Sequence, residues 1–270
     1  VSVLTSLDKA DLERLGIQRT PGQLVGKMAQ ALSLHADEVY ESLESDRQRE
    51  LCRGMFQALT VQESDQRGIR RPQRLGSLAQ ILEVSTDELR PIIDAYRAQQ
   101  LRLAVYEVLP AAATYNTFYL LDGMLSSTLP EGAKESDYKR VYAGYNDAGE
   151  PVGVALLRGE SGFQDVILVI FGFDPASNTL SGMKVLESKE TPGLGDKIFK
   201  DQAWVDQFFD GPQTPLVPVK PGAGKGMPGE IDTITGATIS TKAVIAIINN
   251  AIAEWEPVLE TGIPEEGAQP

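Results

Sequence analysis

The strongest constraint on the fold is a series of four short segments in the middle of the chain, each with the pattern of a β-strand. β-Branched and aromatic residues recur in them at the spacing at which a pleated strand buries one face. Glycine, proline and aspartate mark turns between consecutive segments. The four segments are residues 138–145, 152–157, 165–173 and 180–187. Since short turns join neighbouring antiparallel strands, the sequence predicts a four-stranded antiparallel meander.

Helical patterns flank this meander on both sides. Residues 96–124 have a helical pattern that is interrupted at Pro110, which ends one helix and lets another begin. A short helix is predicted over residues 201–209, and a final helix from about Ser240, where apolar residues recur at helical spacing. The predicted fold class is therefore α+β, with an antiparallel meander sheet packed with helices.

The N-terminal part of the chain contains an internal repeat. The segment from Gly26 to Leu32 recurs from Gly76 to Leu82, roughly fifty residues later. Each copy predicts two short helices, the second of them capped near His35 or Ser85. We therefore predict a small all-α repeat module over residues 1–97, followed by an α+β domain over residues 98–270.

Composition excludes several kinds of site. The chain has one cysteine, Cys52, and one histidine, His35. An internal disulfide and a metal site built from cysteine or histidine clusters are thereby excluded, and no metal site is predicted. The net charge of −13 lies mainly in the C-terminal part. Such a surface repels phosphate backbones, so nucleic acid is not an expected partner.

Two further features concern partners and location. A basic cluster at Arg67, Arg70, Arg71 and Arg74 leaves a DNA-binding regulator as a minor alternative. The chain begins with Val1 and shows neither a signal peptide nor an apolar run long enough to span a bilayer. We expect that a signal or membrane anchor has been removed, or that the helical module takes its place.

The first motif that indicates chemistry lies just before the final helix and reads Asp232-Thr-Ile-Thr-Gly-Ala-Thr238-Ile-Ser-Thr241. Hydroxyl residues before a helix usually act as N-caps. The same turn could anchor a phosphate-bearing cofactor, because N–H groups at a helix start attract negative charge. From the motif alone, both interpretations stay open, and Asp232 could simply form an Asx turn.

The second motif is the loop Glu187-Ser-Lys-Glu190-Thr191-Pro192-Gly193-Leu194-Gly195-Asp196-Lys197-Ile198. Two glycines that flank a leucine let a backbone approach a flat ligand closely, and a proline stiffens the entry. An ordinary connection between a strand and a helix is the alternative for this loop taken alone.

Together, and in this order, the two motifs resemble those of the covalent FMN-binding domain family. This family includes the G subunit of Rnf electron-transport complexes and the C subunit of Na⁺-pumping NADH:quinone oxidoreductases. The resemblance covers roughly residues 100–258 and is closer to the Rnf protein, because the last helix opens with Thr-Gly-Ala-Thr-Ile-Ser-Thr. It implies that the predicted α+β domain over residues 98–270 is a covalent FMN-binding domain.

The resemblance implies a role for each residue of the two motifs. Thr238 would carry FMN as a phosphoester through its hydroxyl, with Thr235, Gly236 and Ala237 around the phosphate. Asp232 would belong to the sequence that a separate flavin transferase reads. Ser240 and Thr241 are candidate phosphate donors or helix caps. The remaining implied flavin contacts come from the loop, with Thr191 the main polar contact: Glu190, Thr191, Gly193, Leu194, Gly195 and Lys197.

The function implied by the resemblance is that of an electron-transfer flavoprotein subunit rather than a stand-alone enzyme. It would relay electrons within a membrane-associated, Rnf-like redox complex of the ion-translocating kind, on the periplasmic or extracytoplasmic face. Its partners would be the other subunits and an FAD-dependent, Mg²⁺-requiring flavin transferase. A non-catalytic scaffold or flavin-dependent sensor, in which the helical repeats dock a partner, is the alternative.

Overall fold

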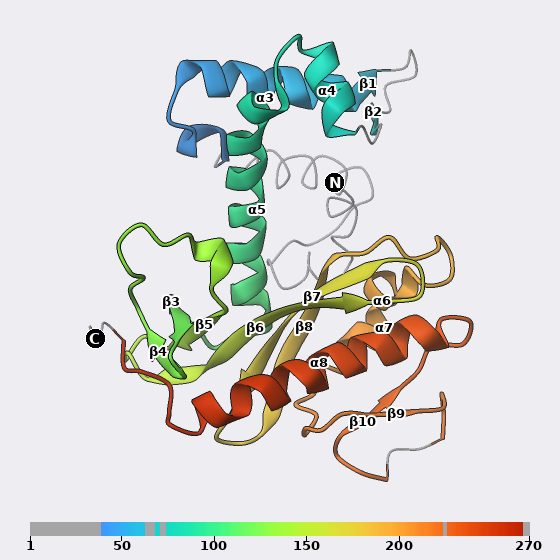
Figure 1. The fold of residues 1–270 in the computed structure, drawn as a ribbon. Helices are drawn as coiled ribbons and strands as arrows, with labels where there is room; N and C mark the ends of the chain where they lie inside the picture. Colours follow the sequence, from blue (N-terminus) through green and yellow to red (C-terminus); the bar gives the residue numbers. More distant parts are fainter. Residues whose placement is uncertain (1–38, 63–67, 71–73, 224–225, 267–270) are drawn as a thin grey trace. The chain divides into compact units, whose positions relative to one another are not determined.

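The structure is a computed structural model that describes residues 39–62, 68–70, 74–223 and 226–266. The chain divides into two compact units, Val1–Arg102 and Leu103–Pro270. The boundary falls within the long helix α5 (Thr86–Val108) (Figure 1). The predicted division after residue 97 stays a prediction, and each unit is described by itself.

The described part of the first unit contains helices and one pair of strands. Its elements are α3 (Asp46–Leu59), β1 (Thr60–Gln62), β2 (Gly68–Arg70), α4 (Leu75–Ile81) and the first turns of α5. The second copy of the repeat forms two helices as expected, but only α4 is short. The second helix, α5, has 23 residues and includes the start of the helix predicted from residue 96. Most of the first copy, and the arginines at positions 67 and 71, lie outside the described residues. The antiparallel pair of β1 and β2 departs from an all-α module, since Thr60-Val61 and Ile69 favour extended backbone.

A capping box starts α5. The Ser85 hydroxyl accepts a hydrogen bond from the Glu88 amide at 3.3 Å, and the Glu88 carboxylate accepts one from the Ser85 amide at 3.0 Å. These two bonds satisfy donors that a helix start leaves free. Apolar side chains from α3, α4 and α5, including Leu51, Leu78 and Leu89, form the core of this unit.

The second unit is built on a six-stranded antiparallel sheet with the strand order β4-β3-β5-β6-β7-β8. The strands are β3 (Thr114–Leu121), β4 (Met124–Ser126), β5 (Arg140–Tyr145), β6 (Pro151–Ser161), β7 (Val166–Asp174) and β8 (Thr179–Glu187). The four predicted meander strands are confirmed as β5 to β8, and the predicted α+β class is confirmed.

The predicted helix after Pro110 is wrong, because residues 114–126 form β3 and β4. β3 pairs with β5 from Thr114 opposite Tyr145 to Tyr119 opposite Arg140. Its run of threonine and aromatic residues favours a pleated strand. The spacing of apolar residues alone does not distinguish a helix from a strand here, since the pairing of β3 with β5, further along the chain, decides which one forms.

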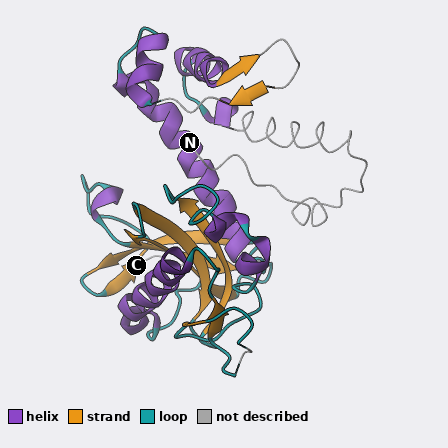
Figure 2. Ribbon diagram, turned by 90° about the vertical axis from the view of Figure 1, so that its right-hand side faces the viewer, coloured by secondary structure: helices purple, strands orange, loops and turns teal. Residues whose placement is uncertain are grey.

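The remaining elements follow the sheet in the sequence. They are α6 (Lys197–Lys200), α7 (Gln202–Asp206), the parallel pair of β9 (Val217–Val219) and β10 (Glu230–Asp232), and α8 (Thr238–Leu259). A short 3-10 turn (Glu135–Asp137) precedes β5. Figures 1 and 2 show the large sheet of the second unit as curved, with α8 lying along one face of it.

Burial of apolar side chains holds α8 on the sheet. Val244 and Ile248 of α8 are fully buried in one cluster with Val154, Leu156 and Phe171 of the sheet. Each such side chain contributes about 1.5–3 kcal/mol when removed from water. The N-terminus of α8 is therefore fixed at the end of the sheet where β8 runs into the loop 188–196. In the part of the chain that the structure describes, no helix has the length and apolar character needed to cross a membrane.

Candidate functional site

Thr238 is the first residue of α8 and is exposed. Its hydroxyl has one intramolecular contact, with the carbonyl oxygen of Ile234 at 3.5 Å, which is at the outer limit for a hydrogen bond. Gly236, with φ +85°, makes the turn that leads into the helix. The backbone thus presents a threonine hydroxyl to solvent at the start of a 22-residue helix.

The first turn of α8 has free hydrogen-bond donors. Ala237 occupies the N-cap position and supplies no side-chain cap. No described residue accepts a hydrogen bond from the N–H groups of Thr238, Ile239 or Ser240. Because these groups point along the helix axis away from the helix body, the site favours a negatively charged ligand group.

The structure corrects the roles expected for Ser240 and Thr241. Both were candidate caps or phosphate donors, but α8 starts two residues earlier than predicted and buries both side chains. The Ser240 hydroxyl donates to Oε2 of Glu190 at 2.5 Å. The Thr241 hydroxyl donates to the carbonyls of Ala237 and Thr238, each at 3.1 Å. Neither hydroxyl is free for a phosphate.

Glu190 lies inside the protein rather than at its surface, with 5% of the residue exposed. Its Oε1 accepts hydrogen bonds from the amides of Phe163 at 2.8 Å and Gln164 at 3.0 Å, in the turn between β6 and β7. Its Oε2 accepts the hydroxyl of Ser240. One carboxylate therefore joins the β6–β7 turn, the loop after β8 and the first turn of α8.

The two glycines of the loop differ in their surroundings. Gly193 has φ +78°, and no atom lies within 4 Å of the place where a β-carbon would be. Gly195 is buried, and a β-carbon there would lie 2.6 Å from Oε2 of Glu190 and 3.0 Å from the Ser240 hydroxyl. Gly193 thus leaves open space at the surface, whereas Gly195 makes room for the Glu190 carboxylate.

The rest of the loop is held by its own hydrogen bonds. The carbonyl of Thr191 accepts the amides of Leu194 at 3.1 Å and Asp196 at 3.3 Å. The buried carboxylate of Asp196 accepts the Gly193 amide at 2.8 Å and pairs with Lys200 at 2.6 Å. These contacts fix the loop while half of Leu194 stays exposed.

The two sequence motifs meet in space. A β-carbon at Gly236 would lie 3.6 Å from a methyl group of Leu194, so the leucine of the loop lies beside the glycine before Thr238. Three exposed apolar side chains come from the segments that Glu190 joins: Phe163, Leu194 and Ile239. No pattern in the chain pointed to Phe163, because its place here depends on the bond from its amide to Glu190.

Three predicted site residues line an open pocket of about 470 Å³. They are Lys197, Asp232 and Thr235, and Trp204 and Gln207 line the same pocket. The indole N–H of Trp204 donates to the Asp232 carbonyl at 2.6 Å, and the Asp232 amide donates to the Gln207 side chain at 2.9 Å. The backbone of Asp232 is therefore fixed at the end of β10.

Comparison with known proteins gives the family of this chain. Residues 162–253, which contain both motifs, match the FMN-binding domain model. Over 156 residues the chain is 30% identical to the G subunit of the ion-translocating oxidoreductase complex of Methanosarcina acetivorans; the match covers 58% of this chain and 75% of that protein. The chain belongs to the FMN-binding domain family. The family predicted from the two motifs is thus confirmed.

Other relatives of this FMN-binding domain protein have similar names. It is 32% identical over 165 residues to the G subunit of the Na(+)-translocating ferredoxin:NAD(+) oxidoreductase complex of Acetobacterium woodii, covering 61% of this chain and 78% of that protein. Among solved structures, NqrC of Shewanella oneidensis matches 62% of this chain and 85% of its own, with a TM-score of 0.45 and 20% identity.

The residues around Thr238 fit FMN. An exposed hydroxyl and three free amides suit a phosphate, and the exposed side chains of Leu194 and Ile239 offer apolar surface to an aromatic ring. Among the described side chains, no group of three His, Cys, Asp or Glu residues could hold a metal ion. The arrangement therefore suits cofactor binding at an exposed surface.

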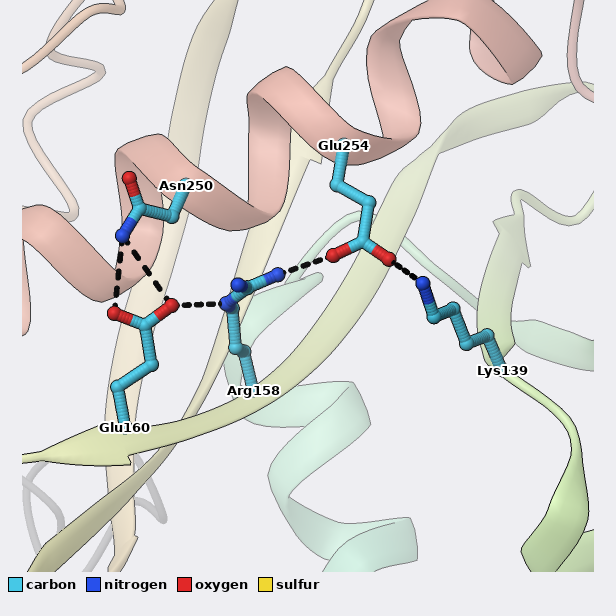
Figure 3. A network of polar contacts seen from close by, with 5 residues as sticks. All are labelled: Lys139, Arg158, Glu160, Asn250 and Glu254. Atoms are coloured by element: carbon cyan, nitrogen blue, oxygen red, sulfur yellow. Dashed lines mark hydrogen bonds and ion pairs between the residues drawn. The ribbon is translucent and has the colours of Figure 1, made fainter.

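A network of charged side chains fixes α8 further along its length (Figure 3). Glu254 of α8 pairs with Lys139 and with Arg158 of β6, and Arg158 also pairs with Glu160. Asn250 of α8 donates to Glu160 at 3.0 Å. The hydrogen bond from Lys139, opposed by partial burial and helped by Arg158, lowers the pKa of Glu254. The network ties α8 to the sheet and lies apart from the residues that surround Thr238.

Proposed function

We propose that this FMN-binding domain protein carries FMN as a phosphoester on Thr238 and relays electrons as a subunit of a membrane-associated redox complex of the Rnf type. The observation that carries the proposal is the exposed Thr238 hydroxyl at an uncapped helix start with three free amides. The names of its relatives support the assignment to a complex, since they are G subunits of ion-translocating oxidoreductases.

We do not expect the chain to form this ester by itself. A threonine hydroxyl is a poor nucleophile unless a base takes its proton. Two buried carboxylates lie in this region, and both already accept hydrogen bonds. That of Glu190 accepts them from Phe163, Gln164 and Ser240. That of Asp196 accepts them from the Gly193 amide and Lys200. We therefore assign attachment to a separate flavin transferase that uses FAD and Mg²⁺, with Asp232 in the sequence it reads. The hydroxyl oxygen of Thr238 forms the new O–P bond, the pyrophosphate bond of FAD breaks, AMP leaves, and the hydroxyl proton is released.

Several residues then act on the bound group. The free amides at the start of α8 stabilise the phosphate charge, and Gly236 and Ala237 leave space beside it. Leu194 and the open surface at Gly193 would border the flavin on the loop side. Following the resemblance, Thr191 would be a polar contact of the flavin, with Lys197 nearby. Bound FMN supplies the redox chemistry. The ester keeps it from dissociating between encounters with electron donor and acceptor.

Mass spectrometry tests the linkage. The chain is coexpressed with a flavin transferase, denatured, and examined for in-gel flavin fluorescence and for an intact mass raised by one FMN less one water. Thr238→Ala abolishes both signals, because it removes the acceptor hydroxyl. Thr261→Ala, which changes an exposed threonine just beyond the other end of α8, keeps both. A colourless wild-type protein under these conditions refutes the proposal.

We also propose a periplasmic or extracytoplasmic location, following the resemblance to the Rnf G subunit. Protease added to intact cells, after the outer membrane is opened where there is one, tests it. Degradation of the protein while a cytoplasmic marker survives supports this location, and protection of the protein contradicts it.

A further inference from the structure

The start of α8 has no side-chain cap, but it has a tertiary contact in its first turn. Ala237 at the N-cap has no side-chain oxygen, and alanine is a poor residue for this position. An uncapped first turn tends to fray. Here the second residue after Thr238 compensates, since the buried hydroxyl of Ser240 bonds to the Glu190 carboxylate at 2.5 Å.

Glu190 is itself held in a fixed place. Its other oxygen accepts two backbone amides of the β6–β7 turn, so the carboxylate is bonded on both sides. Two glycines enclose it: a β-carbon at Gly162 would lie 2.6 Å from Oε1, and one at Gly195 would lie 2.6 Å from Oε2. Because both of its oxygens are bonded, the Glu190 carboxylate links the β6–β7 turn of the sheet to the first turn of α8.

We propose that Glu190 is a positioning residue for flavin attachment. Through Ser240 it holds the first turn of α8, and thereby directs the Thr238 hydroxyl toward the incoming phosphate of FAD. This inference rests on the function proposed above and changes the role expected for Glu190, which acts through Ser240 and not by contact with flavin. What the site requires of Glu190 is its length and its two-sided bonding rather than its charge.

Three substitutions distinguish the effect of the length and bonding of the Glu190 side chain from the effect of its charge. Glu190→Gln keeps the length of the side chain, an acceptor for the two amides, and a donor that can reach the Ser240 oxygen. Glu190→Asp keeps the charge but is one methylene too short to bond on both sides. Ser240→Ala removes only the link to α8 and keeps a good helix former. Thr241→Val is the matched control, because among the described residues the Thr241 hydroxyl bonds to the carbonyls of Ala237 and Thr238 and not to the sheet or its loops.

The first measurement is the initial rate at which purified flavin-free protein is labelled by flavin transferase, FAD and Mg²⁺. Ser240→Ala and Glu190→Asp each slow labelling by about tenfold, which corresponds to about 1.4 kcal/mol. Glu190→Gln and Thr241→Val stay within about threefold of wild type, the equivalent of under about 0.7 kcal/mol. The double variant of Glu190→Asp and Ser240→Ala is no slower than the slower single variant, because both remove one contact.

The second measurement needs no flavin. Hydrogen exchange in the flavin-free protein reports on the Thr241 amide, which donates the first hydrogen bond of α8, to the Ala237 carbonyl at 2.9 Å. Exchange at this amide becomes about tenfold faster in Ser240→Ala and Glu190→Asp, and stays as in wild type in Glu190→Gln, because the first turn frays only when the Glu190 link is lost.

The outcomes distinguish the inference from its alternatives. Wild-type labelling of both Ser240→Ala and Glu190→Asp overturns it. Slow labelling of Glu190→Gln with normal labelling of Glu190→Asp assigns the effect to charge and also overturns it. Additive losses in the double variant point to direct reading of Ser240 by the transferase, against the inference. If the wild-type protein is never labelled, the proposed function fails, and hydrogen exchange at the Thr241 amide alone tests the inference. Unchanged exchange in Ser240→Ala then refutes the positioning role of Glu190 as well, whereas faster exchange supports it.

Discussion

Alanine at Gly195 provides a direct test of how tightly the Glu190 carboxylate is enclosed. The backbone of Gly195 is not in the left-handed region, so alanine suffers no conformational penalty there. Its β-carbon, however, would lie 2.6 Å from Oε2 and 2.8 Å from Cβ of Glu190, and 3.0 Å from the Ser240 hydroxyl. Both neighbours are buried and bonded, so neither can turn out into solvent.

The magnitude follows from these contacts. Forcing one extra methyl group into a packed site costs about 1–3 kcal/mol. Displacing Glu190 also weakens the hydrogen bond between Ser240 and the carboxylate, a kind of bond that contributes about 1.5–3 kcal/mol. We expect a loss in the free energy of unfolding of about 3 kcal/mol, and a fall in Tm of about 6–12 °C for a domain of this size.

The assay is urea unfolding monitored by tryptophan fluorescence. This signal reports on the second unit, because both tryptophans, Trp204 and Trp255, belong to it. Gly193→Ala is the matched control. It has open space but a φ of +78°, so alanine costs about 1 kcal/mol of backbone strain and does not touch Glu190. If Gly195→Ala destabilises the protein no more than Gly193→Ala, the enclosure of the carboxylate is refuted.

Two further predictions concern pH and an unpaired hydroxyl. Since the pKa of Glu254 is lowered from 4.5 by Lys139, its ion pairs stabilise the fold above about pH 4.5 and are lost as pH falls through the lower folded value. Urea unfolding of Glu254→Gln therefore shows a loss of about 0.5–1 kcal/mol at pH 7 that shrinks at acidic pH; a loss independent of pH contradicts this. The buried Tyr142 hydroxyl has no hydrogen-bond partner among the described residues, and burial raises its pKa to about 12. Tyr142→Phe leaves the unfolding free energy unchanged or raises it by about 1 kcal/mol; a clear loss would reveal a missed partner.

Much of the fold could be predicted because its signals are local. The strands β5 to β8 each have the required alternation, and tight turns force their antiparallel order. β3 could not be predicted in the same way, since its residues fit both a helical and a strand pattern. Its pairing with β5 decides that it is a strand. The start of α8 was placed two residues late because Ala237 gives no capping signal.

The site shows the same division between local and tertiary information. By itself the sequence determined which hydroxyl is a candidate for flavin attachment, since the two motifs together resemble those of the covalent FMN-binding domain family and the resemblance assigns this role to Thr238. Only the tertiary structure shows that the side chains of Glu190 and Ser240 are buried and bonded to each other. They are 50 positions apart, and the hydrogen bond that joins them exists because the sheet and α8 pack together. A contact between distant segments leaves no periodic pattern in the chain. The sequence therefore did not indicate that Glu190 is buried against the first turn of α8.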